Sequence, residues 1–450
     1  MKSLTRICVA SPNRHGRRIQ IFFVSIFSVA GVFLSNANAQ KTMSTSHGRN
    51  YNEANVGNYI VPDPLLGKDG RRVNDANAWN AVRRGEILRD FRDLMYGHTP
   101  KLPVALRREV VAIRKDAVNG LATRTLITLR FFDDPNAPRI NLMLYVPNKA
   151  TQPVPVFLGL SFYGNASVED DPSIPLDQGW MRQHSTAVVN HRATELLRGI
   201  SAHRWPLELP LERGYGVATF YYGDVEPDHI EGWRNGIRGY VLKRSGRTKP
   251  APNEWGALGA WAWGLSRALD YLQTNPAVDA NRVVVFGHSR LGKTALWAGA
   301  QDERFALVIS NNSGEGGASL ARRNFGENIA YSIAHASWRY CYRFRDFINR
   351  EEDLPFDQHM LLALIAPRPI YVCSATEDLL SDPKGKFLST VHAEPVYRLF
   401  GLRGVDTIQW PKPDHPVGQT IGYHLRTGKH AITAYDWEQF IKFADRHLRD

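Results

Sequence analysis

Cysteine is scarce in this sequence, which has only three among its 450 residues. Cys8 lies in an N-terminal segment that we expect to be removed, which leaves Cys341 and Cys373. Two cysteines are too few for the disulfide framework that stabilises small secreted scaffolds. They either form one disulfide in an oxidising compartment or stay buried as thiols, and the sequence leaves both outcomes open.

Patterns that bind metal ions or nucleic acids are missing as well. The sequence contains no C-x-x-C and no H-E-x-x-H pattern, so we expect no metal site and no cofactor. It has no block of Lys and Arg, although the formal net charge is +12. Residues 1–39 contain five basic and no acidic residues, so without them 51 basic and 44 acidic residues leave +7. We therefore expect no nucleic-acid partner, and at most a weak attraction to acidic polysaccharide.

The N-terminal apolar run, Ile19–Leu34, is shorter than the ~20 residues that a membrane span needs. Basic residues precede it and Ala37-Asn38-Ala39 follows it, which is the pattern of a signal peptide and its cleavage site. We expect residues 1–39 to be removed, so that the mature chain starts at Gln40. No cysteine follows the run to carry a lipid anchor. The pattern predicts an exported protein, periplasmic or secreted, without membrane attachment.

The rest of the chain alternates between strand-like and helical patterns. Hydrophobic residues make up 43% and charged residues 22%, which is typical of a globular protein with a large core. We expect strands at 110–113, 123–132, 140–146, 154–162, 216–222, 283–286, 305–310 and 369–374, and helices at 75–96, 254–272, 294–300, 357–365, 384–400 and 435–448. This order predicts an α/β fold with antiparallel N-terminal strands and a mostly parallel central sheet covered by helices on both faces. We expect one catalytic domain over residues 40–450, with an irregular, lid-like insertion at 166–212.

The most informative stretch runs from Val283 to Lys293 and reads VVVFGHSRLGK. A serine at a sharp turn between a strand and a helix is the nucleophile elbow of α/β hydrolases, where small neighbours let two backbones approach. Gly287 lies two residues before Ser289, but the second glycine, Gly292, follows one place later than usual. The alternative is a glycine-rich turn in which Ser289 only caps the helix.

A serine hydroxyl needs an imidazole to take its proton and a carboxylate to orient that imidazole. In α/β hydrolases these partners follow the serine in the order acid, then histidine. Asp378, after the strand at 369–374, is the expected acid, with Glu315, Glu377 and Asp382 as alternatives. His430, in a late loop before the last helix, is the expected base, and His415 and His424 also qualify by position.

Two cations follow the serine at the start of the next helix, Arg290 and Lys293. Cations at a helix N-terminus oppose its dipole, which argues that they have a use, such as binding an anionic transition state or a hydroxyl-rich sugar acid. The alternative is a solvated pair of charges. Asn165, after the strand at 154–162, is either an oxyanion donor or a turn residue, and we favour the turn.

Three motifs resemble bacterial glucuronoyl esterases of carbohydrate esterase family 15: GHSRLGK at 287–293, SGEGG at 313–317 and DQHMLLALIAPRP at 357–369. The resemblance implies an α/β hydrolase that cleaves esters between lignin alcohols and 4-O-methyl-glucuronic acid side groups of glucuronoxylan. It implies Ser289 as nucleophile, His430 as base and Arg290 in the oxyanion site. It also implies Lys293 on the sugar hydroxyls, with weaker assignments of Glu327 to sugar binding and Trp338 to the pocket wall.

Two departures from the family pattern concern the acid and its surroundings. Many members carry the acid just before the SGxGG run, where this chain has Asn312, and an amide cannot stabilise an imidazolium as a carboxylate does. Other bacterial members carry it after the later strand, where Asp378 lies. An aromatic residue often found two places beyond that acid is replaced by Leu380. We expect a monomeric esterase with a Ser-His-Asp triad. The alternatives are an acetyl or feruloyl esterase that acts on xylan, and a carbohydrate-binding protein that has lost its catalytic activity.

Overall fold

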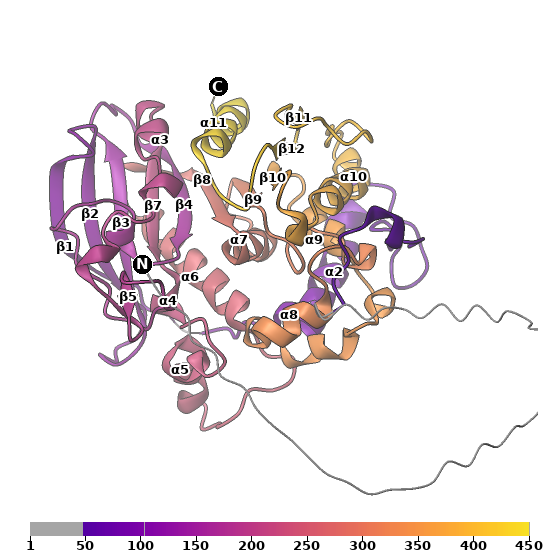
Figure 1. The fold of residues 1–450 in the computed structure, drawn as a ribbon, viewed down its shortest axis with the longest axis horizontal. Helices are drawn as coiled ribbons and strands as arrows, with labels where there is room; N and C mark the ends of the chain where they lie inside the picture. The colour runs from indigo at the N-terminus through magenta and orange to yellow at the C-terminus, as the bar shows by residue number, and fades with distance from the viewer. Residues whose placement is uncertain (1–47, 103, 450) are drawn as a thin grey trace, which may run out of the picture. The chain divides into compact units, whose positions relative to one another are not determined.

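The computed structural model describes residues 48–102 and 104–449. The predicted signal peptide, residues 1–39, lies outside the described residues. Ten strands form one sheet in the order β1-β2-β3-β7-β4-β8-β9-β10-β12-β11, and β5 and β6 form a separate pair (Figure 1). The strands are β1 (Arg107–Ala117), β2 (Ala122–Arg130), β3 (Arg139–Pro147), β4 (Val154–Ser161), β5 (Val188–Val189), β6 (Arg192–Ala193), β7 (Gly216–Tyr221), β8 (Val278–His288), β9 (Leu307–Asn311), β10 (Ile370–Ala375), β11 (Val417–Gly418) and β12 (Ile421–Arg426).

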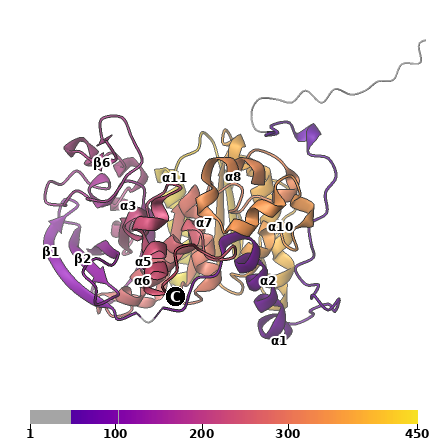
Figure 2. The same ribbon diagram turned by 90° about the horizontal axis from the view of Figure 1, so that it is seen from below.

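The sheet changes from antiparallel to parallel along this order. β1, β2, β3 and β7 pair antiparallel, the strands from β7 to β12 pair parallel, and β11 pairs antiparallel with β12. This agrees with the predicted mostly parallel sheet that begins with antiparallel strands. Because parallel strands end at one edge, the loops after β8, β9, β10 and β12 gather there. Figure 2 shows β1 and β2 curving away at one end of this sheet, with α2 and α10 at the other.

Helices cover both faces of the sheet, as predicted. The helices are α1 (Ala76–Ala78), α2 (Arg84–Phe91), α3 (Glu208–Glu212), α4 (Tyr222–Val225), α5 (Ile237–Arg244), α6 (Ala257–Leu272), α7 (Arg290–Gln301), α8 (Ile329–Ala336), α9 (Gln358–Ala363), α10 (Pro383–Leu399) and α11 (Ala434–Leu448). In Figure 1, α3 and α11 lie on one side of the strands, with α6, α7 and α9 on the other.

The alternation of side chains along β8 explains this layering. Val283 and Val285 belong to the apolar cluster that includes Leu265 of α6, whereas Val284 and Phe286 belong to the cluster that includes α11. Successive residues of a strand point to opposite faces, so an uninterrupted apolar strand must be covered on both. The central strand is therefore buried between two helical layers.

The first predicted helix, over 75–96, is one continuous helical segment with two π-helical turns, Trp79–Arg83 and Arg92–Tyr96. The Asp75 side chain caps it by accepting a 2.8 Å hydrogen bond from the Ala78 N–H. It ends at Gly97, whose φ of +83° is a conformation that glycine adopts without strain. Both residue types are typical of helix ends.

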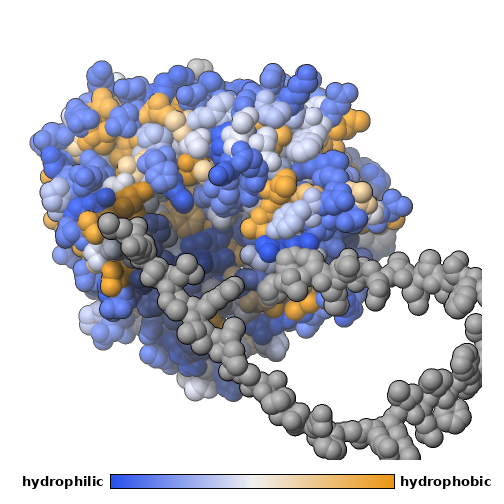
Figure 3. Space-filling view, viewed as in Figure 1, coloured by the Kyte–Doolittle hydropathy of each residue, from blue (hydrophilic) through white to orange (hydrophobic). Residues whose placement is uncertain are grey.

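The two described cysteines, Cys341 and Cys373, are buried and free, which decides between the two outcomes that the sequence left open. Among the described helices, none is both long and apolar enough to cross a membrane. On the face drawn in Figure 3, hydrophobic residues lie in small separate groups among polar ones.

Candidate active site

Ser289 lies at the turn between β8 and α7 with φ +57° and ψ −130°, a conformation that is strained for a residue other than glycine. Its side chain makes no capping hydrogen bond to α7, so the alternative of a simple helix cap is wrong. A Cβ added to Gly287 would lie 2.1 Å from the Leu291 carbonyl oxygen. A Cβ on Gly292 would lie 3.0 Å from the Gly287 carbonyl oxygen and 3.1 Å from that of Asn311. The displaced second glycine therefore also serves close packing at the turn.

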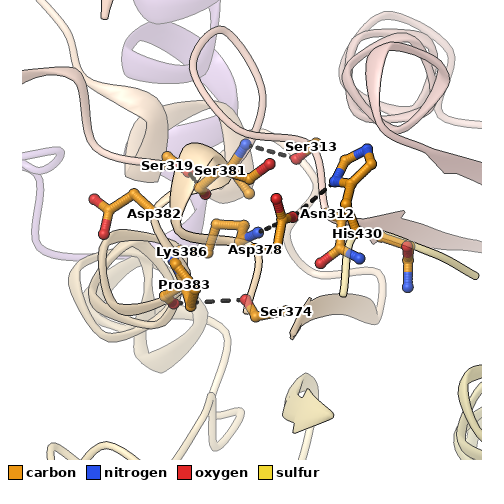
Figure 4. A network of polar contacts seen from close by, with 12 residues as sticks. Asn312, Ser313, Ser319, Ser374, Asp378, Ser381, Asp382, Pro383, Lys386 and His430 are labelled. Carbon is orange, nitrogen blue, oxygen red and sulfur yellow. Dashed lines mark hydrogen bonds and ion pairs between the residues drawn. The ribbon is translucent and has the colours of Figure 1, made fainter. Parts of the chain in front are cut away.

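The predicted base and acid meet beside this turn. His430 Nδ1 lies 2.8 Å from Asp378 Oδ2, and Figure 4 shows the imidazole directed toward the carboxylate. The His430 side chain is 40% exposed, whereas Asp378 is buried. The His430 ring also lies 4.6 Å from the ring of His288, the residue before Ser289. The loops after β8, β10 and β12 thus bring the expected nucleophile's neighbour, the acid and the base to one edge of the sheet.

Opposing effects act on the Asp378 carboxyl. Burial raises its pKa. The hydrogen bond from His430 and the charge of Lys386 lower it by more than burial raises it, so the pKa lies below its ordinary value. Asp378 is therefore ionised at neutral pH. An ionised carboxylate accepts a hydrogen bond from the Nδ1–H of His430, which selects the tautomer that leaves Nε2 free to act as a base.

The other candidate acids have different environments. Asp382 pairs with Arg323 at 3.0 Å and accepts a hydrogen bond from the Gly385 N–H at the start of α10. Glu315 is buried, and this burial is the main reason why its pKa lies well above the ordinary value. Its Oε1 has no hydrogen-bond partner among the described residues. Glu377 is exposed. None of these three forms a hydrogen bond or ion pair with an imidazole in the described part of the chain.

Asn312, at the position where many family members carry the acid, contributes to the site in another way. Its Nδ2 donates a 3.0 Å hydrogen bond to the carbonyl of Ala431, the residue after His430. Asn312 has a φ of +48°, which asparagine tolerates better than most residues. The amide therefore tethers the loop of the base, and within the described residues it makes no hydrogen bond to an imidazole nitrogen.

The alternative histidines are occupied elsewhere. His424 lies in β12, fully buried, with its Nε2 2.9 Å from Asp436 Oδ1 and its Nδ1 3.1 Å from the Tyr371 hydroxyl. His415 lies in a turn, with Nδ1 2.8 Å from the Pro413 carbonyl. Both imidazoles have structural partners, which leaves His430 as the exposed histidine next to a buried carboxylate.

Arg426, at the end of β12, clamps the loop that carries His430. Its guanidinium donates hydrogen bonds to the carbonyls of Thr427 (2.8 Å), Lys429 (2.8 Å) and Ala431 (3.2 Å). Asp436 at the start of α11 holds Arg426, with Oδ2 3.1 Å from its Nε. The same Asp436 accepts from the Thr433 N–H in the capping box of α11. This network fixes both ends of the loop.

Arg290 points into a buried polar network centred on Asp228. Its Nε lies 2.9 Å from Asp228 Oδ2, and it donates to the Tyr222 hydroxyl at 3.2 Å. Arg339 and Trp338 also bind Asp228, through contacts of 2.7 to 2.9 Å. Burial raises the pKa of Asp228, but the charges of Arg339 and Arg290 lower it well below the ordinary value. Asp228 therefore holds Arg290 in place, while Trp338 is fixed at the same carboxylate.

Lys293 is buried, not solvated as in the alternative interpretation. Its Nζ donates to Glu327 Oε2 at 3.2 Å. Burial lowers the pKa of Lys293, but the charge of Glu327 raises it to above the ordinary value. Lys293 and Glu327 thus form a partly shielded ion pair one helical turn beyond Ser289.

The predicted insertion forms one wall of a cavity next to this network. The cavity has a volume of about 820 Å³ and is lined by residues of the insertion, among them Asp177, Trp180 and Arg192. Pro227 and His229, the neighbours of Asp228, also line it, and the His229 ring lies 4.5 Å from the ring of Trp180. Asn165 begins a 3₁₀ turn, and its backbone N–H donates to Asp177 at 3.1 Å. It is therefore a turn residue, as favoured from the sequence.

Comparison with known proteins identifies the family. A family model described as "Glucuronyl esterase, fungi" matches residues 206–401. A carbohydrate esterase from an unknown prokaryotic organism is 46% identical over 403 residues, which cover 89% of this chain and 92% of that protein. The solved glucuronoyl esterase from Solibacter usitatus is 46% identical and superimposes with a TM-score of 0.83. The match covers 88% of this chain and 100% of the Solibacter chain. The chain belongs to carbohydrate esterase family 15.

A third relative is a promiscuous carbohydrate esterase family 15 enzyme from a marine bacterial metagenome. It is 45% identical and superimposes with a TM-score of 0.84, and the match covers 89% of this chain and 100% of the metagenomic one. As in these family 15 structures, the fold here is that of an α/β hydrolase. The chain is therefore a carboxylic ester hydrolase by family.

Sequence reasoning missed several residues of this family 15 site. Asp228, Arg339, Arg426 and Asp436 are charged residues whose partners lie in distant segments, so spacing along the chain does not reveal them. One signal was available for Asp228, which follows the strand Gly216–Tyr221 at the edge where the site forms. A carboxylate after a parallel strand is a candidate by position even where its partner is unknown.

Proposed function

We propose that the protein is an exported serine esterase that hydrolyses esters between lignin alcohols and the glucuronic acid side groups of glucuronoxylan. The observation that carries the proposal is the 2.8 Å contact between His430 Nδ1 and Asp378 Oδ2, with the His430 ring 4.6 Å from that of His288, the neighbour of Ser289. Membership of the family and the buried cations Arg290 and Lys293 support it. The relatives that match it include proteins named glucuronoyl esterase and 4-O-methyl-glucuronoyl methylesterase.

The proposed reaction proceeds through an acyl-enzyme. Ser289 Oγ attacks the ester carbonyl carbon while His430 Nε2, the ring nitrogen not bound to Asp378, accepts the hydroxyl proton. The oxyanion that forms is stabilised by Arg290, through its guanidinium and through its backbone N–H at the start of α7. The alcohol leaves with the proton from His430, and a water molecule activated by His430 then releases glucuronate from Ser289.

The remaining polar groups are assigned to the sugar. Lys293 and Glu327 together offer a donor and an acceptor at 3.2 Å from each other, an arrangement suited to adjacent sugar hydroxyls. Trp338, held through its indole N–H by Asp228, is assigned to the pocket wall. The chemistry assigned to these residues requires no metal ion or organic cofactor.

The test is a comparison of substrates with the purified mature chain. Hydrolysis of methyl and benzyl glucuronate is measured next to release of acetate and ferulate from substituted xylan, with Ser289→Ala as the background. The proposal expects kcat/KM on glucuronate esters to exceed that on the other esters by at least about tenfold. A preference for acetyl or feruloyl esters would replace it with another hemicellulose esterase, and sugar binding without turnover would indicate a lapsed enzyme.

Export, the domain boundary and the oligomeric state are part of the proposal. We propose that residues 1–39 are a signal peptide and that residues 40–450 form a single catalytic domain that acts as a monomer in the periplasm or outside the cell. N-terminal sequencing of the protein from the producing cells should find Gln40 first. Sedimentation of that material should give the mass of one chain, and a larger mass would correct the assignment.

A further inference from the structure

Lys386 is a fully buried lysine behind the acid of the site. It lies in the first turn of α10 with 0% of its surface exposed. Its Nζ is 3.9 Å from Asp378 Oδ2, the same oxygen that contacts His430 (Figure 4). Among the described residues, no acceptor has hydrogen-bonding geometry to this Nζ. Burial lowers the pKa of Lys386, and the charges of Asp378 and Asp382 offset this only in part. Lys386 therefore acts on Asp378 through the charge of its ammonium group and not through a hydrogen bond.

The position of Lys386 is unfavourable for folding alone. Burying an ammonium group is costly unless a charge compensates it, and a cation in the first turn of a helix opposes the helix dipole. Neither cost is recovered by a hydrogen bond in the described part of the chain. A buried cation in the first turn of α10 therefore indicates that Lys386 has a role in the adjacent active site.

The charges around Lys386 single out Asp378 as its partner. The titratable groups that face it are Asp378, Asp382, Cys373 and Glu327, and His288 also senses its charge. Two of the carboxylates are compensated by other cations: Asp382 by Arg323 at 3.0 Å, and Glu327 by Lys293 at 3.2 Å. The thiol of Cys373 is uncharged, because burial raises its pKa well above the ordinary value. Asp378 is left with His430 and Lys386.

His430 cannot supply the compensating charge in the resting enzyme. A general base must be neutral before it accepts the serine proton, so at that stage the imidazole gives Asp378 a hydrogen bond but no positive charge. An ionised carboxylate that is only 3% exposed would then tend to take up a proton. A protonated Asp378 would no longer hold His430 in the tautomer that leaves Nε2 free.

We propose that Lys386 is a positioning residue that keeps Asp378 ionised while His430 is neutral. The proposal rests on the proposed roles of Asp378 and His430. Lys386 touches neither substrate nor reacting atoms, and its effect on the reaction passes through the carboxylate. By keeping Asp378 ionised, Lys386 keeps the Asp378–His430 pair in its active form as pH falls.

The test compares three variants that separate charge from packing. Lys386→Met keeps the length of the side chain and removes the charge, whereas Lys386→Arg keeps the charge. Lys384→Met is the matched control, because Lys384 lies in the same turn of α10 but is 38% exposed and pairs with Glu53 at 3.2 Å. If Lys386→Met does not fold by circular dichroism, Lys386→Gln takes its place.

The first readout is the pH profile of kcat/KM on benzyl glucuronate. In Lys386→Met the acid limb should move up by about one pH unit, which means about a tenfold loss at a pH below the wild-type limb. The loss should fall on kcat, with KM changed less than about threefold. Lys386→Arg should restore most of the profile, and Lys384→Met should match the wild type.

The second readout needs no substrate and therefore remains valid if the proposed function fails. The ¹³C carboxyl shift of Asp378, assigned with Asp378→Asn, is followed against pH in the wild type and in Lys386→Met. The neutral variant should take up the proton at a higher pH than the wild type by about one unit or more. An unchanged carboxyl titration, or a wild type in which Asp378 is already protonated at pH 6, would overturn the proposal.

Discussion

Replacing Asp378 with asparagine should reduce kcat by about a thousandfold. During the reaction His430 becomes an imidazolium, 2.8 Å from a carboxylate oxygen that is almost completely buried. Two charges about 4 Å apart interact by ~4 kcal/mol at the effective dielectric constant of ~20 that suits protein interiors. At 1.36 kcal/mol for each factor of ten, this amounts to about three orders of magnitude in rate.

Asparagine is the informative replacement because it keeps the size of the side chain. Its amide can also donate a hydrogen bond to Nδ1, which selects the wrong tautomer of His430 and adds to the loss. The assay is the initial rate of benzyl glucuronate hydrolysis over a range of concentrations, so that kcat and KM are obtained separately. KM should change little, because Asp378 is separated from the substrate by the imidazole.

Asn312→Ala is the matched control for Asp378→Asn. The Asn312 side chain donates a hydrogen bond to the Ala431 carbonyl, which tethers the loop of the base without carrying charge. We therefore expect a loss of about tenfold or less. If Asp378→Asn kept more than about a tenth of the wild-type kcat, or if Asn312→Ala were the more damaging change, the assignment of the acid would be refuted.

Three further predictions follow from the contacts around the site. Arg426→Met should lower kcat about tenfold or more with a smaller effect on KM, since the carbonyls of the His430 loop lose their donor; a wild-type kcat would show that the loop needs no clamp. Asp228→Asn should lower kcat/KM about tenfold or more because Arg290 loses its ion pair, and full activity would remove Arg290 from the oxyanion site. Because the folded pKa of Asp378 lies below its ordinary value of 3.8, its ionised form stabilises the fold above about pH 4, and that contribution is lost as pH falls through the folded pKa. Urea unfolding between about pH 5 and pH 3 should therefore depend less on pH in His430→Ala, and an equal dependence would contradict this linkage.

The layered fold was predictable because most of its elements carry local signals. The strand Val283–Phe286 has three successive valines and is the core of the observed β8, Val278–His288. The predicted helix 384–400 is observed as Pro383–Leu399, with Asp382 as its cap and Pro383 in its first turn. Apolar runs, caps and turn residues act over a few positions, so they can be read from the chain itself.

Elements that depend on distant partners were missed. β12, Ile421–Arg426, contains a histidine and an arginine that are both buried, so it lacks the apolar pattern of a strand. Asp436 on α11 makes both burials possible by pairing with His424 and Arg426. The strand is thus stabilised by a tertiary contact, and the short insertion strands β5 and β6 likewise gave no periodic signal.

The residues of the site likewise fall into those that carry a signal in the sequence and those that do not. Chain order and family motifs led to Ser289, Asp378 and His430, and the latter two are in contact in the structure. The residues that hold them, such as Arg426 and Lys386, are single charges whose partners come from other loops. Their spacing along the chain carries no information about those partners, which only the fold brings together.

The central claim is that Ser289 forms a covalent glucuronoyl intermediate with the help of His430 and Asp378. The most direct measurement is mass spectrometry of the enzyme after an acid quench of its reaction with benzyl glucuronate, with Asp378→Asn used to slow release. The account predicts an adduct with the mass of one glucuronoyl group on the peptide that contains Ser289, and none in Ser289→Ala. An adduct on another residue, or unreduced turnover by Ser289→Ala, would contradict it.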